Sequence, residues 1–152
     1  MARSGSCVEV QDGVEATHEN AMAIDLNHTI VHARDPAASA AALADLLGRP
    51  DPVRYGPFHG VELDNGVTLD FMRSDGDPVA QHYAFLVSEP EFDRIFGRIA
   101  ERGLRYWADP GRRQPGRINH NDGGRGVYWE DADGHLLEII TRPYGSGAQD
   151  AR

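Results

Sequence analysis

Four residues that can bind a metal ion occur at two duplicated positions in this sequence. His28 and His82 are each followed, seven residues later, by an acidic residue and a proline. Asp70 and Glu138 each close a six-residue motif of the form Asn/Asp-Gly-x-x-Leu-Asp/Glu. Because both patterns recur in the same order, we infer that the chain contains an internal duplication.

Two imidazoles with one or two carboxylates form a donor set that suits iron(II), manganese, nickel or zinc. Glu138 interrupts the apolar run at 136–140, where a buried carboxylate is costly unless it is paired or bound to a metal. A single histidine or carboxylate on a strand is more often a core or surface residue. The duplication of all four positions favours a metal site, in which Asp70 is the weakest member because its side chain is the shorter.

The chain divides into two units of similar layout. Each acidic-Pro pair stands at the start of a segment that ends at a glycine. Proline near the first residue and glycine just after the last residue are typical of helices. Alternating patterns and an Asn-Gly turn indicate strands in the rest of each unit. In the first unit we expect a strand at 23–33, a helix at 36–47 and strands at 52–56, 58–64 and 67–73; in the second, a strand at 80–88, a helix at 89–102 and strands at 104–108, 126–130 and 135–142.

These elements predict a single α+β domain at residues 23–144. It consists of two βαβββ repeats, at about 23–73 and 80–142, with the helices packed on one side of a mixed sheet. Residues 1–22 have neither helical nor strand periodicity, and we interpret them as a disordered N-terminal tail. We interpret residues 145–152 as a flexible C-terminal tail.

Composition limits the partners and the compartment. The 152 residues carry a formal charge of −9, which argues against nucleic acid and anionic membranes as partners. The only cysteine, Cys7, cannot form an internal disulfide or a cysteine-based zinc site. Apolar runs are too short to cross a bilayer, and the first residues do not resemble a signal segment. We therefore expect a cytoplasmic protein.

Over roughly residues 24–143, the chain resembles the vicinal oxygen chelate superfamily, which includes glyoxalases, bleomycin-resistance proteins and type I extradiol dioxygenases. The resemblance implies paired βαβββ modules that close into a cup, with helices on the outer face and ligands from the first and last strands. His28, His82 and Glu138 match the three-ligand set of the superfamily. Asp70 falls where glyoxalase I-like members place a second carboxylate ligand.

Residues 118–138 also resemble the signature of extradiol dioxygenases. The match runs from His120 through Val127-Tyr128 and Gly134 to Glu138, and it departs from the signature at Ala132, where proline is expected. Proline would only stiffen a turn at this position, so the departure affects rigidity rather than chemistry.

The extradiol resemblance implies a role for each residue. Iron(II) would be held by His28, His82 and Glu138, a facial triad that leaves positions open for substrate and oxygen. His120 would hydrogen-bond or protonate the oxygen intermediate, and Tyr128 would hydrogen-bond a substrate oxygen.

The glycine- and arginine-rich loop at 109–126 is a second candidate for substrate contact. It would act as a lid, and Arg125 is the guanidinium nearest to the expected site strand, suited to a substrate carboxylate. A solvated loop that balances surface charge is the other interpretation of these arginines.

The predicted function is that of a single-domain extradiol ring-cleavage dioxygenase acting on a catechol-type aromatic, in a homodimer. One alternative is a glyoxalase-like lyase or isomerase, in which all four ligands hold nickel or zinc. The other is a metal-free drug-binding resistance protein, although histidines at both first-strand positions argue against it.

Overall fold

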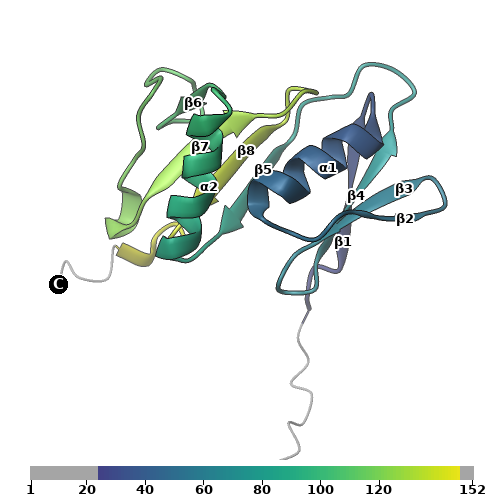
Figure 1. Cartoon of the computed structure of the whole chain (residues 1–152). Coiled ribbons are helices and arrows are strands. Elements are labelled where there is room, and N and C mark those ends of the chain that lie inside the picture. Colours follow the sequence, from purple (N-terminus) through teal and green to yellow (C-terminus); the bar gives the residue numbers. More distant parts are fainter. Residues whose placement is uncertain (1–23, 148–152) are drawn as a thin grey trace, which may run out of the picture.

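The computed structural model describes residues 24–147, which form two four-stranded sheets, each accompanied by one α-helix (Figure 1). The first sheet has the order β1-β4-β3-β2 and the second has the order β5-β8-β7-β6. In each sheet the first and last strands pair in parallel, and the remaining pairs are antiparallel. The same βαβββ layout therefore occurs twice, and the predicted fold class is confirmed.

The elements follow one another in the same way in both modules. The first module contains β1 (His28–Ala33), α1 (Pro36–Leu47), β2 (Val53–Tyr55), β3 (Phe58–Glu62) and β4 (Thr68–Arg73). The second contains β5 (His82–Leu86), α2 (Glu89–Glu101), β6 (Tyr106–Trp107), the short 3-10 helix η1 (Asn121–Gly123), β7 (Gly126–Glu130) and β8 (Leu136–Ile140).

Local sequence fixes the ends of the helices. The Asp35 side chain accepts a hydrogen bond from the Ala38 backbone N–H (3.1 Å) and caps α1, and Gly48 ends this helix in the left-handed conformation. Ser88 caps α2 in the same way by accepting from the Glu91 N–H at 3.3 Å. Each helix therefore begins where its acidic-Pro pair predicted.

The first strand is shorter than predicted. It begins at His28 rather than at residue 23, because its partner strand β4 begins at Thr68, which is the residue opposite His28. Residues 24–27 have no partner strand beside them, although the Asn27 carbonyl still accepts a hydrogen bond from the Thr68 N–H. Leu26, which the predicted strand at 23–33 included, therefore lies outside the strand.

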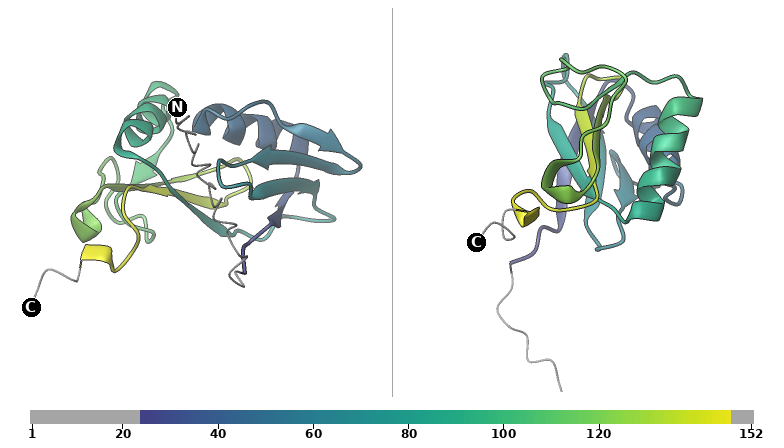
Figure 2. Two further views of the ribbon diagram at one scale, coloured as in Figure 1. Left: turned by 90° about the horizontal axis from the view of Figure 1, so that it is seen from below. Right: turned by 90° about the vertical axis from the view of Figure 1, so that its left-hand side faces the viewer.

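Each sheet has one face covered by its helix and one face without a helix. Figure 2 shows both helices on the same side of the strands. The covered faces form the core together with the helices, and include Val31, Phe71, Val127, Leu137 and Ile139. Side chains alternate between faces along a strand. The metal-capable residues at the predicted positions therefore lie on the uncovered faces, and we refer to these as the open faces.

His135 connects the two modules. Its ring is almost fully buried, and its Nε2 lies 2.7 Å from the backbone carbonyl of His32. Its Nδ1 accepts a hydrogen bond from the Gln81 backbone N–H at 3.0 Å. Since a carbonyl can only accept, Nε2 must donate, and the neutral ring satisfies one polar group in each module.

The residues at the chain ends bear on two of our interpretations. The proposed tail at 1–22 and residues 148–152 lie outside the described residues. Within the described part, Gly147 donates its N–H to the Asp122 side chain at 3.1 Å, so the first residues after 144 are held against η1. No helix within residues 24–147 has the length and apolarity needed to cross a membrane.

Candidate metal centre

The centre of the candidate site is a histidine and a glutamate on neighbouring strands of the second sheet. Glu138 has no exposed surface, and its Oε2 lies 3.2 Å from His82 Nε2. Within residues 24–147, Oε2 has no hydrogen-bond partner, because the contact with the ring lacks hydrogen-bond geometry. This buried oxygen is therefore left without the partner that a buried carboxylate requires.

The other ring nitrogen of His82 determines what faces this oxygen. Nδ1 lies 2.9 Å from the carbonyl oxygen of Leu136, which can only accept a hydrogen bond. Nδ1 must therefore carry a proton, and in the neutral ring Nε2 has a lone pair that is not directed at Oε2. Two acceptors that lie 3.2 Å apart without a hydrogen bond are stabilised by a cation beside them. A divalent metal or a proton would act as this cation, so the residues present fit a metal.

Two phenols complete the surroundings of Glu138. The Tyr144 hydroxyl donates a hydrogen bond to Glu138 Oε1 and lies 2.6 Å from the Tyr128 hydroxyl. The Tyr128 ring also stacks on the His82 ring, with the ring centroids 5.9 Å apart. Oε1 is thus held by Tyr144, while Oε2 remains free for a cation.

Burial keeps both phenols protonated. It raises the pKa of Tyr128 far above its ordinary value, and the hydrogen bonds with Tyr144 and Glu138 raise it further. Burial likewise raises the pKa of Tyr144, with the negative charge of Glu138 acting in the same direction. At neutral pH the two hydroxyls are therefore hydrogen-bond donors rather than phenolates.

The first sheet carries a related carboxylate and phenol. Asp70 is buried, and its Oδ1 has no hydrogen-bond partner within the described chain. Burial and a hydrogen bond with Asp70 raise the pKa of Tyr55 to about 12. Gly60 pairs with Asp70 as Tyr128 pairs with Glu138, and a Cβ at Gly60 would lie 3.0 Å from the Tyr55 ring. The missing side chain at Gly60 therefore makes room for Tyr55 beside Asp70.

His28 does not join His82 and Glu138 within one chain. It lies at the exposed start of β1, where its Nδ1 is 2.8 Å from the Asn27 side-chain oxygen. Among residues 24–147, no three His, Cys, Asp or Glu side chains lie close enough together to hold a metal ion. The predicted convergence of His28, His82 and Glu138, with or without Asp70, is therefore not present in the isolated chain.

His120 lies at the end of a loop near the C-terminal turn. It is exposed and directly precedes η1, and its ring makes no hydrogen bond to the described residues. The neighbouring residue Asp122 holds the backbone of Gly147, in the turn that also contains Tyr144. His120 thus belongs to a segment that borders the Glu138 cluster, and its ring is free to meet a ligand.

Arg125 faces α2 rather than the open face. Its Nε donates to Glu89 at 2.7 Å and its Nη1 donates to Asp93 at 2.7 Å. The guanidinium also lies over the Phe92 ring, 4.3 Å from the centroid. These contacts fasten β7 to α2, so binding of a substrate carboxylate by Arg125 would require these ion pairs to open.

Two tyrosines of the site were not found from the sequence. Tyr144 lies beyond the last strand, in a segment without periodicity, and Tyr55 was assigned only to a short strand. Their places in the chain could have indicated them. Tyr144 follows the strand that carries Glu138, and Tyr55 lies in the same sheet as Asp70. The contacts themselves depend on how the chain folds back after β8 and between β2 and β3.

Comparison with known proteins places this arrangement in a family. No family model matches the chain. The chain is 66% identical to the solved structure of oxidase ChaP-H1, over 81% of this chain and 99% of that one, with a TM-score of 0.79. The metallothiol transferase FosB of Lysinibacillus sphaericus (strain C3-41) is 28% identical over 121 residues, covering 76% of this chain and 81% of that protein.

A more distant structure shares the fold. The fosfomycin resistance protein FosX from Listeria monocytogenes, complexed with Mn(II) and sulfate, is 20% identical over 86% of this chain and all of that chain, with a TM-score of 0.64. The duplicated βαβββ modules and these relatives show that the chain belongs to the vicinal oxygen chelate superfamily. Within it, the high identity to ChaP-H1 relates the chain to an oxidase.

Proposed function

We propose that this protein is a metal-dependent enzyme that oxidises an aromatic small molecule with dioxygen, in the manner of a single-domain extradiol dioxygenase. The observation that carries the proposal is a pair of adjacent metal-capable atoms, His82 Nε2 and the unpartnered Glu138 Oε2, which lie 3.2 Å apart without a hydrogen bond. The similarity to oxidase ChaP-H1 supports an oxidation rather than an isomerisation.

The proposed metal ligands are His82 and Glu138 from one chain and His28 from a second copy. Two histidines and one carboxylate favour iron(II), while manganese, nickel and zinc also suit these donors. In this arrangement the third ligand would come from a partner, because His28 lies apart from the other two within one chain.

The open faces support a homodimer of this kind. Leu86 on β5 is 62% exposed and Val53 on β2 is 67% exposed, although both are large apolar side chains on strands. Burial of these side chains against a second copy would remove apolar surface from water. Two copies related by a twofold axis would each supply the same residues to two identical sites.

Each residue of the cluster has a task in this proposal. A bound iron(II) would supply Lewis acidity and one-electron redox chemistry. Tyr144 holds Glu138 Oε1 and so directs Oε2 toward the metal position. Tyr128, protonated and stacked on His82, donates its one O–H to Tyr144, because Tyr144 donates to Glu138; on substrate binding it would turn this O–H to a substrate oxygen. His120, whose ring is free, would deliver a proton to oxygen during turnover.

A glyoxalase-like lyase is the second candidate, and one observation favours it. Asp70 is buried with an unpartnered oxygen, as expected for a fourth ligand. Asp70→Asn keeps the size and the hydrogen bond with Tyr55 but weakens a ligand. Metal affinity that is lowered at least about tenfold would support four ligands, whereas unchanged affinity would exclude them.

The dioxygenase proposal is tested by oxygen uptake. The protein is purified without oxygen, loaded with iron(II) and given a panel of catechols, and oxygen consumption is followed together with the coloured ring-opened product. We expect turnover in the wild type, none in Glu138→Gln, and a loss of about a hundredfold or more in His120→Ala with the iron retained. Fully iron-loaded protein that consumes no oxygen with any catechol would exclude ring cleavage.

A further inference from the structure

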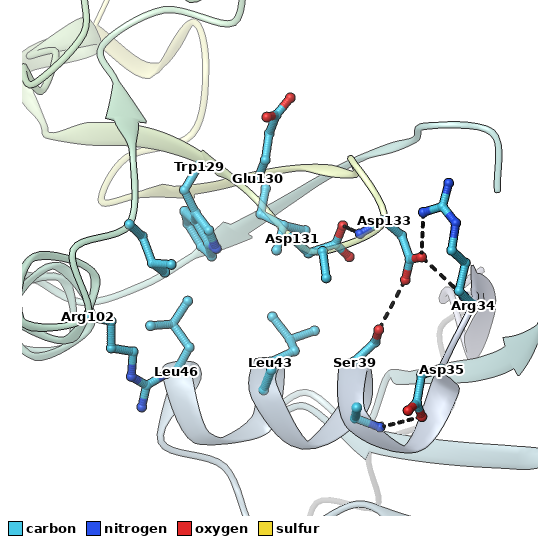
Figure 3. A pocket seen from close by; sticks show the side chains of 15 residues that line it. Arg34, Asp35, Ser39, Leu43, Leu46, Arg102, Trp129, Glu130, Asp131 and Asp133 are labelled. Carbon is cyan, nitrogen blue, oxygen red and sulfur yellow. Dashed lines mark hydrogen bonds and ion pairs between the residues drawn. The ribbon is translucent and has the colours of Figure 1, made fainter. Parts of the chain in front are cut away.

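A cavity of 480 Å³ lies between α1 and the second sheet, near the turn that joins β7 to β8 (Figure 3). Its lining is mostly apolar and includes Leu43 and Leu46 of α1 and Trp129 of β7, which Figure 3 labels, and Leu137 of β8. Each of these side chains is at most 5% exposed. This volume is within the range of about 300–1,000 Å³ that is usual for small-molecule sites.

The cavity is separate from the candidate metal centre. Trp129 directly follows Tyr128 on β7, and Leu137 directly precedes Glu138 on β8. Because neighbouring side chains on a strand point to opposite faces, Trp129 and Leu137 lie on the face opposite to Tyr128 and Glu138. The metal-capable residues lie on the open face, whereas the cavity lies on the side that carries the helices. A ligand in this cavity would therefore not contact the metal ligands.

Apart from Arg102, which lies beside Leu46, the charged residues of the cavity belong to the β7–β8 turn and the start of α1, where acidic groups outnumber basic ones. Four carboxylates and two guanidinium groups belong to the lining: Asp35, Glu130, Asp131, Asp133, Arg34 and Arg102. Both guanidinium groups are occupied, Arg34 by Asp77 and Asp133, and Arg102 by Asp45.

Three of the four carboxylates have side-chain or capping partners. Asp133 accepts from Arg34 Nη1 and from Ser39 Oγ, both at 3.1 Å, and Figure 3 shows this network at the rim. Glu130 pairs with Arg112, and Asp35 caps α1. These groups are therefore satisfied before any ligand binds.

Asp131 is the carboxylate without a cation. Its Oδ1 accepts from the backbone N–H groups of Asp133 and His135, each at 2.9 Å, and its Oδ2 has no hydrogen-bond partner within residues 24–147. Burial raises the pKa of Asp131, which shows that its surroundings disfavour the charge. A cation placed beside Oδ2 would offset this cost.

We propose that this cavity is a second ligand site, which binds a cationic polycyclic small molecule. The rings would lie along the side of α1 that exposes Ala38 and Ala42, over the buried side chains of Leu43, Leu46 and Trp129, and a protonated nitrogen would pair with Asp131. Apolar contact and an ion pair at the edge of the site both favour such a ligand over an anionic one.

The test uses 9-aminoacridine, a planar cation, and acridine-9-carboxylate, an anion with the same rings. Binding is followed by energy transfer from Trp129 in a Trp107→Phe background. We expect saturable binding of the cation and at least about tenfold weaker binding of the anion. A tenfold difference is the size of effect that one charged neighbour commonly has on the equilibrium of an ionisable group.

Three variants locate the probe. Asp131→Asn keeps the Oδ1 acceptor that holds the turn, and it should weaken binding of the cation about tenfold without affecting the fold. Ala42→Trp places a bulky ring at an exposed position of the lining and should abolish binding. Ala41→Trp, at the adjacent exposed position outside the lining, is the matched control and should bind like the wild type.

Several results would overturn the proposal. These are equal affinity for both acridines, no saturable binding, or binding that neither Asp131→Asn nor Ala42→Trp weakens. Loss of binding in Glu138→Gln would place the probe in the metal centre and would also overturn it. Unchanged binding in Glu138→Gln would support a separate site whether or not the protein proves to be a dioxygenase.

Discussion

Glu138→Gln should stabilise the metal-free protein although it removes the proposed metal ligand. In the wild type, Oε2 of this side chain lies 3.2 Å from His82 Nε2, outside hydrogen-bond geometry, and has no hydrogen-bond partner among residues 24–147. When the His82 ring is neutral and Nδ1 carries its proton, Nε2 is an acceptor, and a small rotation of the new side chain would let its amide NH₂ donate to Nε2. The amide oxygen can still accept the hydrogen bond from Tyr144.

The size of the effect follows from these contacts. A buried polar atom without a partner costs about 1–3 kcal/mol, and a neutral hydrogen bond contributes about 1 kcal/mol. Because the replacement has nearly the same shape, little packing is lost. We therefore expect the free energy of unfolding to rise by about 1–2 kcal/mol. The midpoint of thermal unfolding should rise by about 4 °C for each kcal/mol.

The assay is urea unfolding in the presence of a chelator, with and without saturating manganese. Metal at about 100 times its dissociation constant should stabilise the wild type by about 2.7 kcal/mol and the variant not at all. Glu130→Gln, a glutamate at the end of β7 paired with Arg112, is the control and should show no gain without metal. A variant that is less stable than the metal-free wild type would show that His82 is protonated, which would refute this reasoning.

Three further predictions concern neighbouring groups. Tyr144→Phe leaves Glu138 Oε1 without its donor, and we expect metal affinity to fall about tenfold or more in calorimetric titration. The Tyr55 phenol, whose pKa is raised from 10.0 to about 12, should stabilise the fold below pH 10 and lose this contribution between pH 10 and 12. Absorbance titration at alkaline pH should show that Tyr55 ionises with a pKa above 10.0, and Asp70→Asn should lower the pKa of Tyr55 part of the way back to 10.0. His135→Phe leaves two backbone groups unsatisfied between the modules and should lower the free energy of unfolding by about 2–4 kcal/mol.

One result would contradict each of these three predictions. Unchanged metal affinity in Tyr144→Phe would mean that Glu138 binds without help from the phenol. A Tyr55→Phe variant with the same alkaline unfolding curve as the wild type would remove Tyr55 as the cause. His135→Phe with wild-type stability would show that the modules do not depend on this ring.

The sequence predicted most of what local chemistry determines. Helix α1 spans the predicted residues because Asp35 and Gly48 mark its two ends. The first strand was extended too far, because its start depends on where β4 begins rather than on its own residues. Duplication placed Glu138 and His82 on adjacent strands, which follows from the parallel pairing of β5 and β8.

What could not be predicted depends on how distant segments meet. Nothing in the sequence shows how the two modules are placed relative to each other, so His28 was expected beside His82 within one chain. Tyr144 reaches Glu138 only because the chain turns back after β8. The cavity at Trp129 likewise requires α1 of the first module and the β7–β8 segment of the second to line the same space.

The proposed metal site, shared between two copies, is tested most directly by a heterodimer of two inactive variants. His28→Ala and Glu138→Gln are co-expressed with different tags, the heterodimer is purified, and manganese binding is measured by electron paramagnetic resonance. In a shared arrangement, one of the two sites combines three wild-type ligands, so we expect about one tightly bound ion per heterodimer. Each variant homodimer should bind at least about tenfold more weakly. A heterodimer that binds no better than either homodimer would contradict a site shared between copies.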